Sequence, residues 1–132
     1  MRLLLDTHVV LWQLAGSRTL SPAARETIEQ ARDVLFSVVS FAEIGVKAAI
    51  GKLSVPPDLR EHVIRSGLQV LPLDAAHGLA VADLPMHHRD PFDRLLVAQA
   101  RCDDLTIVTA DKRFAAYDVR LVAAAVDPGF VT

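Results

Sequence analysis

The chain has 132 residues, of which 52% are hydrophobic, so it can bury one core, whereas two independent domains would be cramped. We therefore expect a single domain over residues 1–132. Sixteen acidic and 14 basic residues give a formal net charge of −2, which excludes binding of nucleic acid through a general positive field. The single cysteine, Cys102, excludes an internal disulfide and a multi-cysteine zinc site, and its apolar surroundings predict a buried thiol.

Membrane and export signals are missing from the sequence. No positively charged segment followed by a cleavable apolar stretch opens the chain, and no apolar run approaches the roughly 20 residues that span a bilayer. We expect a cytoplasmic protein that does not enter a membrane.

Short apolar or β-branched runs alternate with helical segments along the chain. We predict strands at 2–5, 34–39, 68–73 and 105–109, with 119–122 as an optional fifth. We predict helices at 7–14, 22–32, 41–50, 59–66, 75–84, 91–102 and 112–117. Because the apolar runs do not alternate with polar residues and are separated by helices, the pattern predicts a three-layer α/β/α sandwich around a parallel sheet.

Several helix starts carry capping residues. Ser21 precedes Pro22, which suits an N-cap followed by proline at the first helical position. The segment 40–43 (SFAE) has the spacing of a capping box, with Glu43 at its third helical position. Asp90 before Pro91 is a further expected N-cap.

Four acidic residues share a position at which an apolar run gives way to a helix: Asp6, Glu43, Asp93 and Asp111. Helix capping explains each acid alone about as well as catalysis does. In an open parallel sheet, however, the crevice beyond the carboxyl ends of the strands collects residues from distant parts of the chain. The joint pattern therefore favours one shared site.

The helical neighbours of these acids differ. Asp93 is followed at helical spacing by an apolar row that faces the core, namely Leu96, Val97 and Ala100. The row of Glu43 is mixed, because Lys47 at i+4 allows a surface ion pair.

A crevice with several carboxylates requires a counter-charge. The carboxylates repel one another unless a cation neutralises them. Hard oxygen ligands select Mg²⁺ or Mn²⁺, and Mg²⁺ is commonly held between protein carboxylates and substrate phosphate oxygens. The pattern therefore suits hydrolysis of phosphodiester bonds with one or two ions.

Four motifs carry a resemblance to a known family. They are LLLDTHVVLW, SVVSFAEIGVKAAIGKL, LPMHHRDPFDRLLVAQA and LTIVTADKRF. In this order they resemble the motifs of the PIN-domain ribonucleases, and specifically the VapC-type toxins of bacterial type II toxin–antitoxin modules. The resemblance covers nearly the whole chain. It implies a strand order of 3-2-1-4-5 and a Mg²⁺- or Mn²⁺-dependent endoribonuclease site at the carboxyl ends of the strands.

The resemblance also implies residue roles. It places the four acids of the family, as catalytic residues and metal ligands, on Asp6, Glu43, Asp93 and Asp111. Asp90 is a rival for the third place, but the apolar run follows Asp93, and Asp90 before Pro91 is better explained as an N-cap. His8 stands where many relatives have a small polar residue, and its role stays open.

Basic and histidine side chains near the motifs are weaker candidates. Solvated surface charge explains each basic residue better than binding of RNA phosphates, yet five of them are candidates for it: Lys47, Arg89, Arg94, Lys112 and Arg113. His87 and His88 form half of a metal-site pattern, but nothing at a suitable spacing completes it, so we predict a surface loop.

The implied partners are an RNA substrate, a small cognate VapB-like antitoxin and a second copy of the chain in a homodimer. The segments around Trp12 and IGVKAAIGKL are candidate surfaces for the antitoxin. Two alternative functions stay open: a nuclease of the same superfamily that acts on DNA, and an inactive interaction module. A phosphorelay receiver and a haloacid-dehalogenase-like phosphatase are disfavoured, because Thr7 and His8 stand where those proteins need further acids.

Overall fold

The computed structural model describes residues 1–125. Its centre is a five-stranded sheet of parallel strands in the order β3-β2-β1-β4-β5. The strands are β1 (Arg2–Leu5), β2 (Asp33–Ser37), β3 (Gln69–Leu71), β4 (Thr106–Thr109) and β5 (Arg120–Ala123). The parallel α/β fold and the strand order implied by the resemblance are confirmed, and the optional fifth strand is formed.

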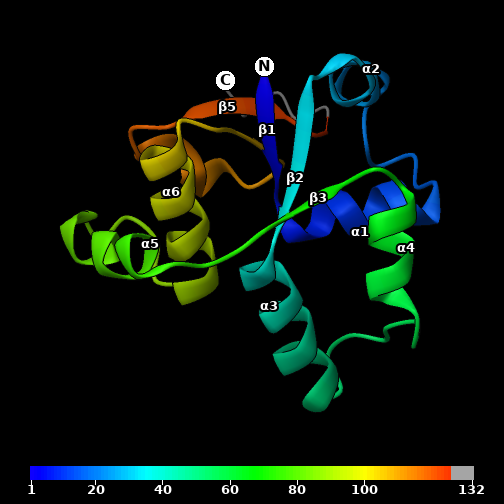
Figure 1. Cartoon of the computed structure of the whole chain (residues 1–132), viewed down its shortest axis with the longest axis horizontal. Helices are drawn as coiled ribbons and strands as arrows, with labels where there is room; N and C mark the ends of the chain where they lie inside the picture. The colour runs from blue at the N-terminus through cyan, green and yellow to red at the C-terminus, as the bar shows by residue number, and fades with distance from the viewer. Residues whose placement is uncertain (126–132) are drawn as a thin grey trace.

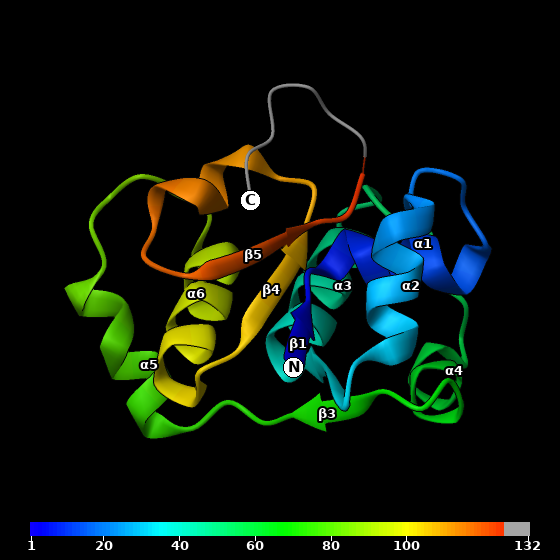
Figure 2. The ribbon, with the colours of Figure 1, turned by 90° about the horizontal axis from the view of Figure 1, so that it is seen from above.

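Helices cover both faces of this sheet. They are α1 (Thr7–Ala15), α2 (Pro22–Gln30), α3 (Val38–Ala49), α4 (Leu59–Arg65), α5 (Ala75–Ala80) and α6 (Pro91–Asp103), with short 3₁₀ helices η1 (Val81–Asp83) and η2 (Lys112–Ala116). Figures 1 and 2 show α1, α2 and α4 on one side of the sheet and α5 and α6 on the other, while α3 extends from the carboxyl end of β2. The three predicted layers are therefore present. Among the helices of residues 1–125, none has the length and apolar composition needed to cross a membrane.

The side chains of β1 show why the sheet needs cover on both faces. Leu3 and Leu5 belong to the apolar cluster under α1, α2 and α4, whereas Leu4 packs into the cluster under α6. All three leucines are fully buried. A central strand of a parallel sheet is buried on both faces, which explains the continuous apolar run instead of an alternating one.

The second strand and the third helix meet earlier than predicted. β2 ends at Ser37, whose hydroxyl oxygen accepts the backbone N–H of Val39 at 3.0 Å and so caps α3. The predicted capping box at 40–43 is therefore wrong, and Glu43 lies inside the helix. Ser37, three positions before Ser40 in the run FSVVS, is an equally good cap, and its buried hydroxyl also donates to Gln99 Oε1 at 2.6 Å.

The prediction of a buried thiol is also wrong, because Cys102 is exposed. Residues 96–100 span more than one full turn of α6 and are all buried, so this part of the helix has no solvent side. Arg101 and Cys102 follow on the solvent side of the last turn. Apolar neighbours in sequence therefore do not predict the burial of Cys102, because the buried run of α6 ends at residue 100.

Candidate functional site

Asp6 lies at the centre of the carboxyl edge of the sheet, between β1 and β4. Its backbone N–H donates to the carbonyl oxygen of Val108 at 2.9 Å, which extends the pairing of the two strands. Its carboxylate caps α1 by accepting the N–H of Thr7 at 2.7 Å, and the hydroxyl of Thr109 donates to the other oxygen, also at 2.7 Å. Three contacts therefore fix Asp6 in place.

Glu43 reaches the same edge from α3. It is 3% exposed, and Thr7 Oγ1 lies 2.7 Å from both Glu43 Oε1 and Ser40 Oγ. A hydroxyl has one hydrogen, so Thr7 donates to the carboxylate and accepts from Ser40. Lys47 forms the i+4 ion pair with the other oxygen of Glu43, and this hydrogen bond raises the pKa of Lys47.

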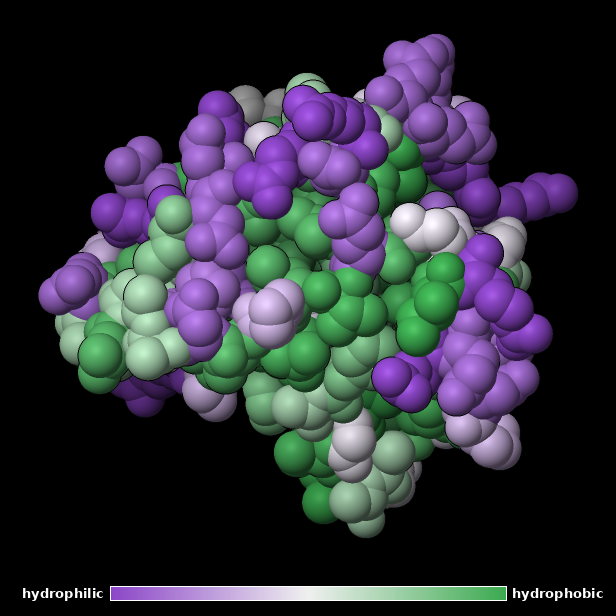
Figure 3. All heavy atoms as spheres, viewed as in Figure 1, coloured by the Kyte–Doolittle hydropathy of each residue, from purple (hydrophilic) through white to green (hydrophobic). Residues whose placement is uncertain are grey.

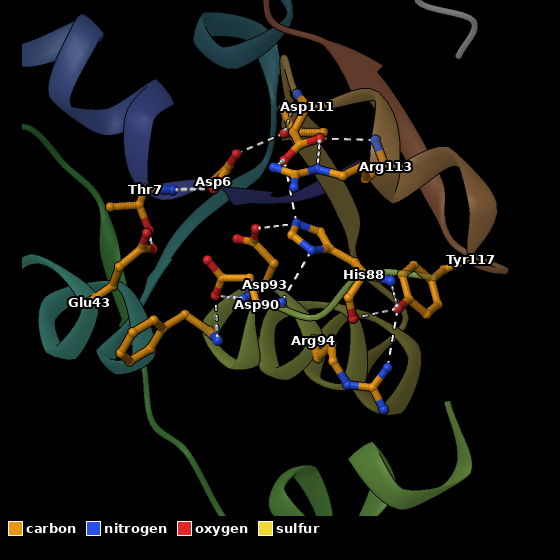
Figure 4. A network of polar contacts seen from close by, with 12 residues as sticks. Asp6, Thr7, Glu43, His88, Asp90, Asp93, Arg94, Asp111, Arg113 and Tyr117 are labelled. Carbon is orange, nitrogen blue, oxygen red and sulfur yellow. Dashed lines mark hydrogen bonds and ion pairs between the residues drawn. The ribbon is translucent and has the colours of Figure 1, made fainter. Parts of the chain in front are cut away.

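Asp90 and Asp93 stand at the start of α6. The carboxylate of Asp90 accepts the backbone N–H groups of Phe92 at 2.8 Å and of Asp93 at 3.3 Å, so the predicted N-cap is confirmed. Asp93 occupies the third helical position and is 9% exposed. The local sequence thus separates the two acids into a capping residue and one whose side chain points toward the other acids (Figure 4).

Asp111 is the N-cap of η2, just after β4. Its carboxylate accepts the backbone N–H of Arg113 at 2.9 Å and is held on both oxygens by the Arg113 guanidinium, at 3.1 and 2.8 Å. Burial alone would raise the pKa of Asp111, but these bonds from Arg113 bring it below the ordinary value. Asp111 therefore stays ionised at neutral pH.

The four predicted acids border one pocket of about 270 Å³ at the carboxyl ends of the strands. Other side chains complete its lining: His8, Trp12, Lys47, Asp90, Ala110 and Arg113. The structure therefore brings together residues that are up to 105 positions apart, from Asp6 to Asp111. It also places His8 on the wall of this pocket.

The pKa values of the acids show that the pocket favours a bound cation. Burial raises the pKa of Asp6 above its ordinary value. Burial, together with repulsion from the surrounding acids, raises the pKa of Asp93 to about 8; these acids are Asp6, Asp90, Glu43 and Asp111. A divalent cation would remove this repulsion, and an all-oxygen set of carboxylates suits Mg²⁺ or Mn²⁺. The residues present therefore fit such an ion.

His88 is a residue of the site that sequence reasoning missed. The prediction of a surface loop holds for His87, which is exposed, but is wrong for His88, which is 5% exposed. His88 Nε2 lies 2.7 Å from Asp93 Oδ2 and 3.5 Å from Asp111 Oδ2. Ligand atoms of these three residues lie within 4.8 Å of one another. The loop 85–90 has no periodicity that would mark one of two adjacent histidines as buried.

The predicted basic residues separate into two groups. Lys47 and Arg113 border the pocket, whereas Arg89 and Lys112 are exposed outside its lining. Arg94 is buried, and its guanidinium donates to Tyr117 and to three backbone carbonyls, those of Val81, Leu84 and Pro85. These contacts make Arg94 a structural residue that holds the loop before α6, and they occupy its guanidinium within the protein.

Comparisons with known proteins agree with this fold and site. Residues 3–120 match the PIN domain. The chain therefore belongs to the PIN-domain family. Within the family it is similar to Ribonuclease VapC22 of Mycobacterium tuberculosis, with 35% identity over 118 residues that cover 83% of this chain and 87% of that protein. The resemblance inferred from the four motifs is confirmed.

Solved structures share the fold at lower identity. VapBC2 from Rickettsia felis, bound to a DNA fragment from its promoter, superposes with a TM-score of 0.70 at 15% identity, covering 92% of this chain and 98% of that one. FitAcB from Neisseria gonorrhoeae gives a TM-score of 0.66 at 21% identity, covering 92% and 97%. At these identities the likeness establishes the architecture.

The raised pKa of Asp93 predicts a stability change that depends on pH. A carboxyl group with a pKa of about 8 in the folded protein and 3.8 ordinarily binds its proton more tightly when folded. Unfolding free energy therefore falls as pH rises from about 4 to about 8. We predict that Asp93→Asn raises the melting temperature in EDTA at pH 8 and changes it little near pH 4.

Thermal unfolding followed by circular dichroism at both pH values measures this difference. Asp83→Asn, at an exposed acid on η1, is the matched control and should show no pH-dependent gain. A shift for Asp93→Asn that is equal at the two pH values would contradict the electrostatic account.

Proposed function

We propose that this protein is a metal-dependent endoribonuclease and the toxin of a toxin–antitoxin pair. The observation that carries the proposal is the convergence of four acids on one pocket at the carboxyl edge of a PIN-type sheet. The similarity to Ribonuclease VapC22 supports RNA as the substrate. The reaction class is hydrolysis of a phosphodiester bond.

The acids would divide the work of holding one or two Mg²⁺ or Mn²⁺ ions. In this proposal, Asp6 and Asp93 bind the principal ion, while Glu43 and Asp111 orient its waters or hold a second ion. An ion held there would lower the pKa of a bound water and neutralise charge on the phosphoryl oxygens. The proposal is supported by the all-carboxylate donor set and by the repulsion that raises the pKa of Asp93.

The remaining polar groups keep these carboxylates in fixed orientations. The hydroxyl of Thr109 holds one oxygen of Asp6, and the hydroxyl of Thr7 holds one oxygen of Glu43. Both threonines are buried, so their hydroxyls do not exchange these partners for bulk water. Such preorganised donors reduce the reorganisation needed when charge develops in the reaction.

Positive side chains at the rim would bind the phosphates of the substrate. Lys47 and Arg113 border the pocket, and each is already paired with one of its acids, Glu43 and Asp111. In the proposal these two residues place the RNA backbone against the acids, and Arg89 and Lys112 extend the contact outside the pocket. The binding is local, as the overall charge of −2 requires.

An apolar surface beside the pocket supports a protein partner. Val46 on α3 and Ile50, the C-cap of this helix, are 50% and 62% exposed, and Leu14 on α1 is 36% exposed. Figure 3 shows a largely apolar surface over the outer part of α3. We propose that a segment of a cognate antitoxin covers this surface and brings a basic side chain to the acids. We also propose that the toxin forms a homodimer.

The first prediction of this function concerns the acids. We expect Asp6→Asn and Asp93→Asn to abolish cleavage of single-stranded RNA, because each removes a ligand charge from the proposed ion. Folding is retained, since asparagine preserves the shape and can still accept hydrogen bonds. Cleavage assays with Mg²⁺ or Mn²⁺ on purified variants measure the loss, and Asp104→Asn, an exposed acid, is the control.

The same assay separates the alternatives. Single-stranded RNA, duplex DNA and flap DNA are compared with and without EDTA. Cleavage of RNA that stops in EDTA supports the proposal. Cleavage of DNA alone would make the protein a nuclease of the same superfamily that acts on DNA. Wild-type activity in both acid variants would contradict the assignment of the site.

A second prediction concerns Lys47. Replacing it with glutamine removes a phosphate contact, so RNA affinity should fall and the slope of log affinity against log salt should decrease by about 0.7 for a single strand. Binding of RNA to the inactive Asp93→Asn protein at several salt concentrations measures the slope. Arg32→Gln, an exposed residue before β2, is the control. An unchanged slope would mean that Lys47 serves only its ion pair with Glu43.

A third prediction concerns the partner surface. We expect Val46→Asp together with Ile50→Asp to prevent copurification with the small protein encoded next to this gene, because charge would be buried in the contact. Leu79→Asp, at a residue of α5 that is 76% exposed, is the matched control and should copurify normally. Copurification of the α3 variant would locate the antitoxin elsewhere.

Light scattering of the free toxin tests the homodimer, and a monomeric mass at all concentrations would contradict it.

A further inference from the structure

His88 is held firmly from several directions. Its ring Nδ1 accepts the backbone N–H of Asp90 at 3.2 Å, and its own backbone N–H donates to the hydroxyl oxygen of Tyr117 at 2.9 Å. Its ring lies edge-on to Phe114, with centroids 6.3 Å apart at an angle of 82°. Figure 4 shows the imidazole beside Asp93 and below Asp111, with Tyr117 on the side away from Asp93.

A second layer of contacts fixes this arrangement. Arg94 Nη1 donates to the hydroxyl oxygen of Tyr117 at 3.2 Å and to the carbonyl oxygen of Pro85 at 3.0 Å. The loop that carries His88 is thereby tied to α6, the helix that carries Asp93. The distance between His88 and Asp93 is thus set by covalent and hydrogen-bonded neighbours of both residues.

The hydrogen bonds of the ring determine its tautomer. Nδ1 accepts an N–H, so it carries no hydrogen, and the neutral imidazole has its hydrogen on Nε2. A nitrogen that carries hydrogen has no lone pair to offer a cation. His88 therefore does not act as a ligand in this arrangement, although it lies in the close group with Asp93 and Asp111.

The surroundings of Nε2 also indicate that His88 is not a metal ligand. The His88 side chain is 4% exposed and lies outside the lining of the pocket, so it does not meet the substrate. Within residues 1–125, Nε2 has no hydrogen-bond partner in straight alignment, because Asp93 Oδ2 at 2.7 Å lies off the N–H axis. A buried donor requires an acceptor. The nearest acceptor is the carboxylate of Asp93. This residue faces His88 on one side and lines the pocket on the other.

We propose that His88 is a positioning residue: a small turn of the Asp93 carboxylate brings Oδ2, 2.7 Å away, onto the Nε2–H axis, and this hydrogen bond orients Asp93 toward a divalent cation in the pocket. The proposal rests on the proposed metal site. Residues that hold a ligand by hydrogen bonding affect metal affinity through that ligand, and their loss typically costs about 10- to 100-fold. His88 acts on the cation only through Asp93.

The test measures Mn²⁺ affinity by isothermal titration calorimetry, without RNA. We expect His88→Leu to weaken Mn²⁺ binding by about tenfold, because Asp93 loses its fixed orientation. His88→Gln, whose amide N–H reaches in the same direction, should keep most of the affinity. His87→Leu, the same change at the exposed neighbour, should bind as the wild type does. In RNA cleavage, His88→Leu at saturating Mn²⁺ should lower kcat and leave KM unchanged.

A spectroscopic signature separates positioning from ligation. Electron spin echo spectra of the Mn²⁺-loaded wild type should lack modulation from a directly bound imidazole nitrogen. Such modulation, lost in His88→Leu, would overturn the proposal by making His88 a ligand. Unchanged Mn²⁺ affinity in His88→Leu, with binding lost in Asp93→Asn, would overturn the positioning role and leave the metal site intact. Absence of Mn²⁺ binding by the wild type would instead overturn the proposed function itself.

Discussion

Mutual repulsion among buried carboxylates is the constraint on which the rest of this structure depends. The pKa of Asp93 at about 8 reports how strongly burial and the neighbouring acids oppose ionisation there. The fold tolerates this because the acids around Asp93 are tied to donors: Asp6 to Thr7 and Thr109, Glu43 to Lys47, and Asp111 to Arg113. The negative charge that these donors do not neutralise can be neutralised by a bound cation.

Helix termini serve the site in two ways at once. Asp6, Asp90 and Asp111 are N-caps, so each places a carboxylate where backbone N–H groups and the helix dipole favour negative charge. Capping and participation in the pocket are therefore compatible roles, because a carboxylate has two oxygens and several lone pairs. The competition between capping and catalysis that the sequence alone presents does not exist in three dimensions.

Sequence was sufficient where one local pattern determined the outcome. The apolar runs located the five strands, and the acids that follow β1 and β4 were placed at the sheet edge by their position after a strand. The sequence was insufficient where contacts between distant segments determine whether a side chain is buried. The burial of His88 depends on Tyr117 and Phe114, and Arg94 is buried because carbonyls of residues 81–85 converge on it. Neither neighbour set has a signature in the local sequence.

The central place of β1 in the sheet also sets how much of the chain must be made before the pocket can form. β1 pairs with β2 and with β4, and the bond between Thr109 and Asp6 joins residues separated by 103 positions. The pocket therefore cannot assemble until nearly the whole described chain has been synthesised. A fragment that ends before β4 has three of the four predicted acids in its sequence but lacks the strand that holds the first of them, so the pocket forms only in a chain that extends past β4.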